Sequence, residues 1–313
     1  MPVQSSAPSR HCDVLVIGSG AGGLSAAVTA AKLGLTVIVA EKDTQFGGTT
    51  AWSGGWMWLP RNPLAVAAGI VEPIDEPLAY LRHELGERFD ETRARAFLEA
   101  APRMVEFFRT NTALRFLDGN AIPDFHGRTP HAALGGRSLC AAPFDGRRLG
   151  ARLTDLKPPL PETTLWGMGI ASGAELRHFF NALRKPASLW YVTQRVLAHA
   201  KDLLLHRRGM RLVNGNALIA SLAASALEAG VDIRTRCPAR RLLRDGERVS
   251  GAVLATPEGA VEVQARCGVV LACGGFPHDD QRKRALLPHA PPGKEHWSAA
   301  SRGNNGDGLR LGE

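Results

Sequence analysis

Three glycines and one acid have the residue types and the spacing that bind a dinucleotide. Residues 12–42 read CDVLVIGSGAGGLSAAVTAAKLGLTVIVAEK, in which Gly18, Gly20 and Gly23 form a G-x-G-x-x-G pattern. In such a motif the first glycine makes a tight turn, the second lets a pyrophosphate approach the backbone, and the third lets a helix pack closely on a strand. Glu41 follows Gly18 by 23 residues. A carboxylate there can accept hydrogen bonds from both ribose hydroxyls, and it repels a 2′-phosphate.

The segments around this motif have the pattern of a βαβ unit. Asp13–Ile17 is a short apolar run, which predicts a buried parallel strand. Residues 22–33 carry apolar side chains at helical spacing, and Gly34 is typical of the position just after a helix. Residues 36–40 predict a second buried strand. In this context a glycine turn without a ligand is the weaker interpretation, because the helix N-terminus offers N–H groups and a partial positive charge to phosphates.

A second segment rich in glycine and hydroxyl groups distinguishes a flavin from a nicotinamide cofactor. After Glu41 the chain reads KDTQFGGTTAWSGGWMWLP. A flavin needs backbone amides and small hydroxyls along its length, whereas an NAD site does not need this segment. A flexible loop is the alternative, but a loop with three tryptophans is unusual. We therefore predict FAD, contacted by the motif residues and by Ser19, Ala21, Gly22, Lys42, Gly47, Gly48, Thr49, Thr50, Ser53, Gly54 and Gly55.

These motifs resemble those of the fumarate reductase and succinate dehydrogenase flavoprotein superfamily. Within it the chain is similar to 3-ketosteroid Δ1-dehydrogenase and its relatives, through GGTTAWSGG (47–55), IPDF (122–125), GGRSL (135–139), PFDGRRLG (143–150), RLVNGNALIASL (211–222), VVLACGGF (269–276) and GNNGDGLRLGE (303–313). The resemblance implies that the backbone near Ala239 meets the adenine and that the turn at Ala272 and Gly274 lies beside the cofactor. It also implies that Asp307 contacts the flavin region; a plain helix N-cap is the alternative for Asp307.

The expected fold is α/β, with a Rossmann-like FAD-binding domain over residues 12–276. We expect a parallel central sheet, a small antiparallel sheet from strands within 241–265, and an inserted region of helices and loops at 60–205. Residues 216–229 predict a helix that precedes a strand at 231–235, and Val269–Ala272 predicts a further buried parallel strand.

Within the insertion, helices are expected at 78–85, 91–108 and 174–206, with Pro102 starting a new helix. Residues 1–11 are expected to be a flexible tail, and 277–313 to begin a substrate-capping domain. Family members continue through that domain, whereas this sequence stops about one turn into a helix. We therefore expect a fragment or a truncated gene product.

The resemblance implies removal of two hydrogens from adjacent carbons beside a ketone. A base takes the α-proton, donors hold the enolate oxygen, and hydride passes to flavin N5. The family's steroid dehydrogenases use tyrosines, and one of these matches Phe125, which cannot donate a proton. His126 is a weak substitute, since a solvated loop histidine is the simpler interpretation. The catalytic residues are therefore left unassigned.

Three functional hypotheses follow. The first is a 3-oxosteroid 1-dehydrogenase-like enzyme acting on a steroid-like or other enolisable ketone, with an unknown electron acceptor. The second is a fumarate reductase- or succinate dehydrogenase-like flavoprotein for dicarboxylates. The third is a truncated, inactive FAD-binding module. No histidine occurs in residues 47–55, where succinate dehydrogenases attach FAD, so we predict noncovalent FAD.

Composition excludes several other classes. The net charge is +8, but its basic clusters carry no nucleic-acid motif and no interleaved aromatic residues, so no nucleic-acid partner is expected. The sequence contains no run of 18 apolar residues, so no membrane span is expected. The absence of a secretory signal favours the cytoplasm. Five cysteines without a CxxC pair predict reduced thiols and no metal site.

Overall fold

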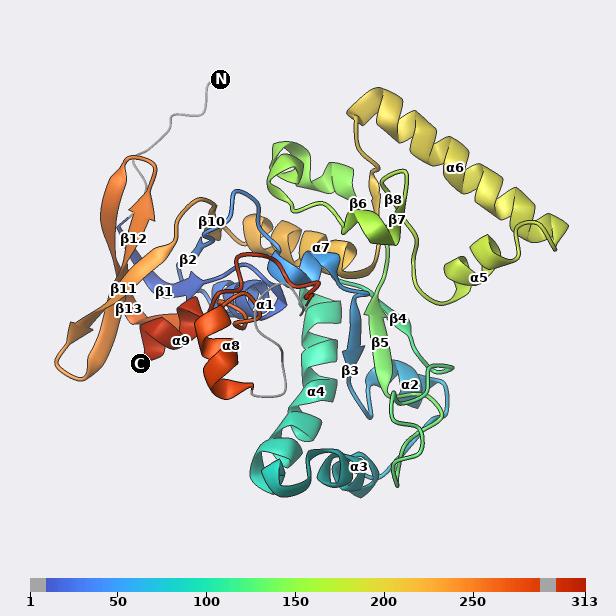
Figure 1. Cartoon of the computed structure of the whole chain (residues 1–313), viewed down its shortest axis with the longest axis horizontal. Helices are drawn as coiled ribbons and strands as arrows, with labels where there is room; N and C mark the ends of the chain where they lie inside the picture. Colours follow the sequence, from blue (N-terminus) through green and yellow to red (C-terminus); the bar gives the residue numbers. More distant parts are fainter. Residues whose placement is uncertain (1–9, 288–296) are drawn as a thin grey trace.

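A six-stranded mixed sheet forms one side of the molecule, at the left of Figure 1, in the computed structural model, which describes residues 10–287 and 297–313. The order is β10-β2-β1-β13-β12-β11. The strands are β1 (His11–Ile17), β2 (Val37–Ala40), β10 (Asp232–Arg234), β11 (Ala239–Asp245), β12 (Arg248–Thr256) and β13 (Gly259–Leu271). The first four strands in this order pair in parallel, and the last two add antiparallel. The predicted parallel sheet is confirmed, and the antiparallel strands within 241–265 extend it.

β13 belongs to both parts of the sheet. Its first half pairs antiparallel with β12 as far as Gln264, and its second half pairs parallel with β1 as far as Leu271. We predicted one strand ending by residue 265 and another starting at 269, and that division is wrong. Gly268 interrupts the apolar pattern and has a φ of 148°. The register with β1 shifts between Cys12 and Val14, so the strand passes through this irregularity without ending.

α1 (Ala21–Lys32) and α7 (Asn214–Glu228) pack together over one face of the parallel strands. Their side chains form one core with alternate residues of the strands, such as Val16 and Val39. The intervening residues Leu15 and Ile38 belong to a second core on the other face. α1 ends as predicted, with Leu33 at its C-cap and Gly34 at a φ of 84°.

The region that follows β2 forms a separate lobe around α4 (Figure 1). It contains the strands β3 (Trp56–Trp58), β4 (Phe116–Asp118) and β5 (Ser138–Ala141), and the helices α2 (Pro63–Ala67), α3 (Asp75–Leu85) and α4 (Glu91–Asn111). We predicted that Pro102 starts a helix, but it lies inside α4. Buried residues continue along one face of α4 from Ala94 to Phe108, so packing of that face outweighs the missing N–H of Pro102.

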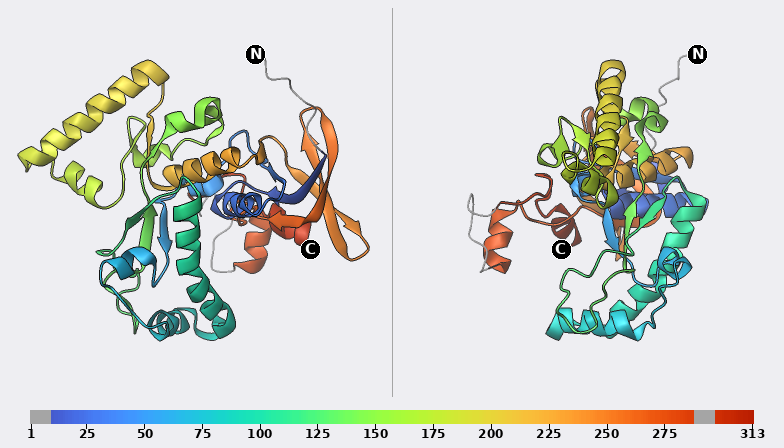
Figure 2. Two further views of the ribbon diagram at one scale, coloured as in Figure 1. Left: turned by 180° about the vertical axis from the view of Figure 1, so that it is seen from behind. Right: turned by 90° about the vertical axis from the view of Figure 1, so that its right-hand side faces the viewer.

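The single helix predicted for 174–206 is also wrong. It is two helices, α5 (Ala174–Phe180) and α6 (Pro186–His206), and α6 projects from the body of the molecule (Figure 2). Pro186 takes the first position of α6 and holds Lys185 in an extended conformation. Short strands complete this region: β6 (Phe144–Asp145), β7 (Thr164–Leu165), β8 (Met168–Gly169) and β9 (Arg211–Leu212).

The last described segments are α8 (Asp280–Leu286) and α9 (Asp307–Gly312), and α9 packs against β11. The division into domains at 12–276 and 277–313 stays a prediction. The part of the 1–11 tail before Arg10 lies outside the described residues. Among the described helices, none has the length and apolar content needed to cross a membrane.

Candidate functional site

The candidate site lies where β1, β2 and β13 end at the same edge of the sheet. A cavity of about 320 Å³ opens there. Gly18 follows β1 with a φ of 106°, and a Cβ on it would lie 2.2 Å from the carbonyl oxygen of Ala272. Only glycine fits this turn, as the motif predicts.

The other motif glycines act in two different ways. A Cβ on Gly23 would lie 1.9 Å from the Gly18 carbonyl oxygen, so this glycine lets α1 pack against the turn. A Cβ on Gly20 would meet nothing closer than Thr50 Oγ1 at 3.6 Å, and one on Gly22 would meet nothing within 4 Å. Both line the cavity. Because α1 has no acidic residue in its first turn, its N-terminal partial charge is not neutralised there.

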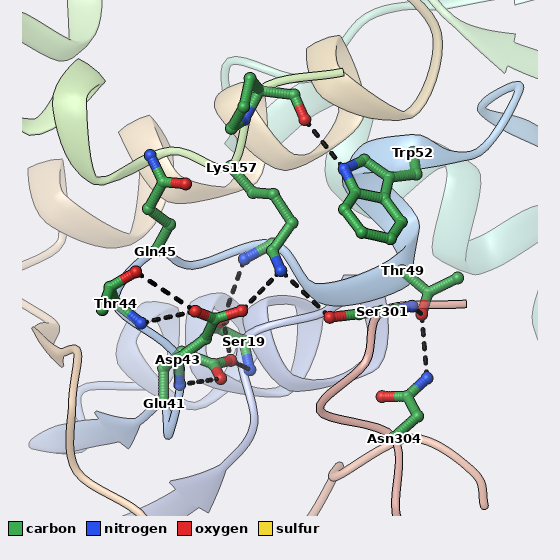
Figure 3. A network of polar contacts seen from close by, with 12 residues as sticks. Ser19, Glu41, Asp43, Thr44, Gln45, Thr49, Trp52, Lys157, Ser301 and Asn304 are labelled. Atoms are coloured by element: carbon green, nitrogen blue, oxygen red, sulfur yellow. Dashed lines mark hydrogen bonds and ion pairs between the residues drawn. The ribbon is translucent and has the colours of Figure 1, made fainter. Parts of the chain in front are cut away.

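Glu41 presents an oriented carboxylate to the cavity. Glu41 is among the residues that line the cavity, and it is only 8% exposed. Oε2 accepts hydrogen bonds from the backbone N of Ser19 at 3.1 Å and from the Ser19 hydroxyl, and Oε1 accepts from the backbone N of Asp43 at 2.9 Å (Figure 3). A carboxylate has about four acceptor positions, so roughly one is left for a further donor.

Lys42 joins the end of β2 to the far end of the chain. Its Nζ forms an ion pair with Asp307 and lies 2.7 Å from Asn305 Oδ1. Burial raises the pKa of Asp307, but Lys42 and Arg310 outweigh it and hold that pKa below its ordinary value. Gly306 is the N-cap of α9 and makes no side-chain cap bond. The alternative interpretation of Asp307 as a plain N-cap is therefore wrong, because Gly306 takes that position.

Thr49 attaches the glycine-rich segment to the same C-terminal region. Its Oγ1 accepts hydrogen bonds from the backbone N of Ser301 at 3.0 Å and from Asn304 Nδ2 at 2.9 Å (Figure 3). Ser301 and Asn304 also line the cavity. Residues at both ends of the chain thus form its walls.

Sequence reasoning did not single out Lys157, which contacts this wall from behind the cavity. It is 7% exposed, and its Nζ donates to Asp43 Oδ2 at 2.5 Å and to Ser301 Oγ at 3.0 Å (Figure 3). The same Nζ lies 5.0 Å from the ring centroid of Trp52. Burial raises the pKa of Asp43, but Lys157 outweighs it and keeps that pKa below its ordinary value. A lysine in a proline-rich segment is ordinarily solvated, so no sequence signal marked it.

The cavity collects most of the residues predicted to bind the cofactor. Those that line it are Gly18, Ser19, Gly20, Ala21, Gly22, Glu41, Lys42, Gly48, Thr49, Thr50, Ala239, Ala272, Gly274 and Asp307. Gly23, Gly47, Ser53, Gly54 and Gly55 are not among the lining residues. Several of these have packing roles instead: a Cβ on Gly55, for example, would lie 2.5 Å from the carbonyl carbon of Asn214.

The two residues considered for proton transfer lie outside the cavity lining. Phe125 is fully exposed, and His126 is an exposed residue hydrogen-bonded to Glu84. Hydrogen bonds from Thr129 and His126 lower the pKa of Glu84. Among the described residues, no group of His, Cys, Asp and Glu side chains is arranged to hold a metal ion.

Known proteins are similar in sequence to this chain over nearly its whole length. A 4-oxocyclohex-2-ene-1-carboxylate 5-dehydrogenase of Sinomonas cyclohexanicum is 36% identical over 301 residues, which are 96% of this chain and 50% of that protein. A 3-oxosteroid 1-dehydrogenase of Mycobacterium tuberculosis is 32% identical over 315 residues, covering 97% of this chain and 54% of that protein. The chain spans about half the length of the curated relatives it matches.

The fold agrees with these relatives. The crystal structure of 3-ketosteroid Δ1-dehydrogenase from Sterolibacterium denitrificans in complex with 1,4-androstadiene-3,17-dione superposes with a TM-score of 0.87 at 34% identity, and the match covers 97% of this chain and 54% of that one. A family model described as an FAD binding domain matches residues 13–313. The chain therefore belongs to the FAD-binding-domain family of flavoproteins.

Proposed function

We propose that this chain binds FAD noncovalently in the cavity at the edge of the sheet, as the flavin-binding part of a dehydrogenase. The supporting observation is that one cavity combines an oriented carboxylate on Glu41, unobstructed backbone at Gly20 and Gly22, and the N-terminus of α1. These features suit a ribose and a diphosphate, so the residues present fit the cofactor.

Each part of the cavity has a task in this proposal. Glu41 accepts a hydrogen bond from the adenosine ribose, and the backbone of Gly20–Gly22 holds the diphosphate. Thr49 and Thr50 line the continuation of the site, and Lys42 with Asp307 closes it from the C-terminal side. Bound FAD supplies the hydride-accepting chemistry, while the chain orients it and excludes water.

The cysteines of the cavity favour noncovalent binding. Cys273 lines the cavity, and burial raises its pKa to about 11. The thiol therefore stays protonated near neutral pH and is a poor nucleophile toward a flavin. Cys237 also lines the cavity, and burial raises its pKa too.

For the substrate we propose an enolisable cyclic ketone that is oxidised at the carbon–carbon bond beside its carbonyl. This rests on the relatives, whose names specify 4-oxocyclohex-2-ene-1-carboxylate and 3-oxosteroids. Neither Phe125 nor His126 lines the cavity, so we assign neither of them a proton-transfer role.

A charge reversal at Glu41 tests the cofactor proposal. We expect the purified chain to quench flavin fluorescence on titration with FAD, and heat denaturation to release all of the flavin. Glu41→Arg should abolish binding, because a cation replaces the acceptor of the ribose hydroxyl. Glu228→Arg, at an exposed site on α7 whose side chain is 62% accessible, is the matched control and should bind normally. Equal FAD affinity in Glu41→Arg and wild type would contradict the assignment.

The substrate class has a separate test. Under anaerobic conditions the FAD-loaded protein is mixed with 4-androstene-3,17-dione or with 4-oxocyclohexanecarboxylate, and the flavin absorbance is followed. Bleaching by a cyclic ketone supports the proposal. A protein that holds FAD but is bleached by neither ketone keeps the cofactor assignment and loses the substrate class.

A further inference from the structure

α6 carries apolar side chains on the face that is turned away from the rest of the protein. This helix projects from the body of the molecule and packs along one side against α5 (Figure 2). Trp190, Leu197 and Leu204 follow one another at intervals of seven residues, so they lie along one face of the helix. They are 65%, 65% and 86% exposed, and Leu189 beside Trp190 is 49% exposed. A stripe of large apolar side chains therefore faces solvent along most of the helix.

The opposite face of α6 carries polar side chains that bond to the rest of the chain. His199 is only 7% exposed, and its Nε2 lies 3.1 Å from the carbonyl oxygen of Trp166. Arg195 Nε donates to Glu175 Oε1 at 2.7 Å. A helix that covers a protein core has the reverse arrangement, with its apolar residues inward and its polar residues outward. Packing among the described residues therefore does not account for the apolar face of α6.

More apolar side chains are exposed on the α5–α6 arm, which we define as residues 174–208. Phe180 and Leu183 are 73% and 96% exposed, and Leu203 and Leu205 are 40% and 64% exposed. Single exposed apolar residues are ordinary on a protein surface, whereas a group of them marks an interaction site. Their concentration on one projecting arm indicates a docking surface.

The exposed charges of the arm are positive. Residues 174–208 contain seven Lys and Arg but two acids, Glu175 and Asp202. Glu175 is 6% exposed, and Arg195 and Arg211 share its carboxylate. Asp202 has a side chain that is 14% exposed, and it accepts from the backbone N of Met210 at 2.9 Å. The exposed cations are Arg177, Arg184, Lys185, Lys201 and Arg207. None of these five has an ion-pair partner within residues 10–287 and 297–313.

We propose that the outer face of α6 docks the protein on a membrane surface that carries anionic phospholipids. With the helix lying along that surface, Leu197 and Leu204 enter the boundary of the acyl chains, and Trp190 lies at the level of the headgroups. The exposed cations of the arm contact the negatively charged headgroups around the helix.

Charge favours a lipid surface over a second copy of this chain. Arg184 and Lys185 lie at the start of α6, and Lys201 and Arg207 lie at its end. Pairing of two such helices would bring cations together in either direction, and this repulsion opposes association. An anionic surface attracts all of these cations.

Co-sedimentation of the whole chain with lipid vesicles tests this proposal. We expect saturable binding to vesicles of phosphatidylcholine mixed with phosphatidylserine. Binding to phosphatidylcholine alone should be at least about tenfold weaker, since several cations contribute to the attraction. Higher salt should weaken binding to the mixed vesicles, because it screens exposed charges.

Paired variants locate the apolar surface. Leu197→Gln combined with Leu204→Gln should weaken binding to the mixed vesicles at least about tenfold, because it removes apolar area buried in the lipid. The matched control is Leu33→Gln combined with Leu134→Gln, at positions that are 73% and 89% exposed. This control lies outside the arm and should bind like wild type.

A charge reversal tests the contribution of the cations. Arg184→Glu should weaken binding at least about fivefold. Arg103→Glu, on the exposed side of α4, changes the net charge equally and should have little effect. Circular dichroism verifies that each variant is folded.

The proposal is overturned if the wild type does not bind the mixed vesicles, if neutral vesicles bind equally well, or if the folded arm variants bind like their controls. A dimer that the leucine variants dissociate, without binding to vesicles, would assign the face to a second copy and would also overturn it.

Discussion

Lys157 carries a charge that is almost removed from water. Such a charge is tolerated in a protein only when partners replace its hydration. Here Asp43 provides a counterion, Ser301 a hydroxyl and Trp52 an aromatic face. Asp43 and Ser301 both line the candidate FAD cavity, whereas Lys157 does not. We infer that Lys157 is a positioning residue for that wall.

Replacement of Lys157 by methionine should separate its charge from its packing. We expect Lys157→Met to lower the free energy of unfolding by about 1–2 kcal/mol at pH 7, since it removes a charge-assisted hydrogen bond to a partly exposed carboxylate. FAD affinity should fall as well, because Asp43 and Ser301 lose their common anchor. Lys157→Arg should restore part of both quantities, and Lys201→Met, on the exposed surface of α6, should change neither.

The same variant has a predicted pH dependence. In the wild type the folded-state pKa of Asp43 is lowered, so its contribution to stability is present above the unfolded pKa of about 4 and is lost as the pH falls through the folded value. The difference between wild type and Lys157→Met should therefore shrink when urea unfolding is measured below pH 4. A difference that stays constant from pH 7 to pH 3 would show that the ion pair is not its source.

At the scale of elements, the site depends on how closely α1 approaches the turn after β1. Gly22 and Gly23, which are adjacent in the first turn of α1, have different surroundings. A Cβ on Gly23 would overlap the Gly18 carbonyl oxygen, whereas one on Gly22 would meet no atom within 4 Å. One glycine is thus needed for packing, and the other borders the cavity.

This difference makes the two glycines a matched pair for mutation. Gly23→Ala should destabilise the protein by roughly 3 kcal/mol or more, because the new methyl group displaces backbone rather than a flexible side chain. Gly22→Ala should leave stability unchanged or raise it by up to about 1 kcal/mol, since alanine favours helix more than glycine does. Chemical denaturation of both variants measures this contrast. Equal losses would mean that helix propensity, not the contact with Gly18, governs this position.

The sequence predicted the elements whose form is set locally. The glycines and the apolar runs around them specify β1, α1 and β2, and Asp245-Gly246 marks the hairpin between β11 and β12. It did not predict that α4 continues through Pro102, because that depends on packing of the helix in the lobe. Lys157 was missed for the same reason, since its partner Asp43 lies 114 residues away.

At the scale of the molecule, the two ends of the chain meet at the cavity. Lys42 pairs with Asp307 across 265 residues, and Thr49 bonds Asn304 across 255. The C-terminal segment is therefore a wall of the site and not an appendage to it. Its attachment depends on polar contacts that are only partly shielded from water, since Lys42 and Asp307 are each 27% exposed in their side chains.

Asp307→Asn tests this attachment. We expect a loss of about 1–2 kcal/mol in the free energy of unfolding at pH 7, because ion pairs to Lys42 and Arg310 become neutral hydrogen bonds. The folded pKa of Asp307 is lowered, so this loss should diminish as the pH falls below about 4, where the wild-type carboxylate becomes protonated. Asp245→Asn in the exposed hairpin is the control. Identical unfolding curves for Asp307→Asn and wild type would show that the pair does not stabilise the wall.

The position of β1 between β2 and β13 affects how the protein emerges from the ribosome. β1 is translated long before its neighbour β13, which follows some 250 residues later, as the pairing of Val14 with Gly268 shows. Until then one edge of the nascent β1 has no partner and its apolar face is uncovered, which favours aggregation. Pairing between strands so distant in sequence is also slow to form. We therefore expect the full sheet to form only after residue 271 has left the exit tunnel, and the protein to depend on chaperones while it is being made.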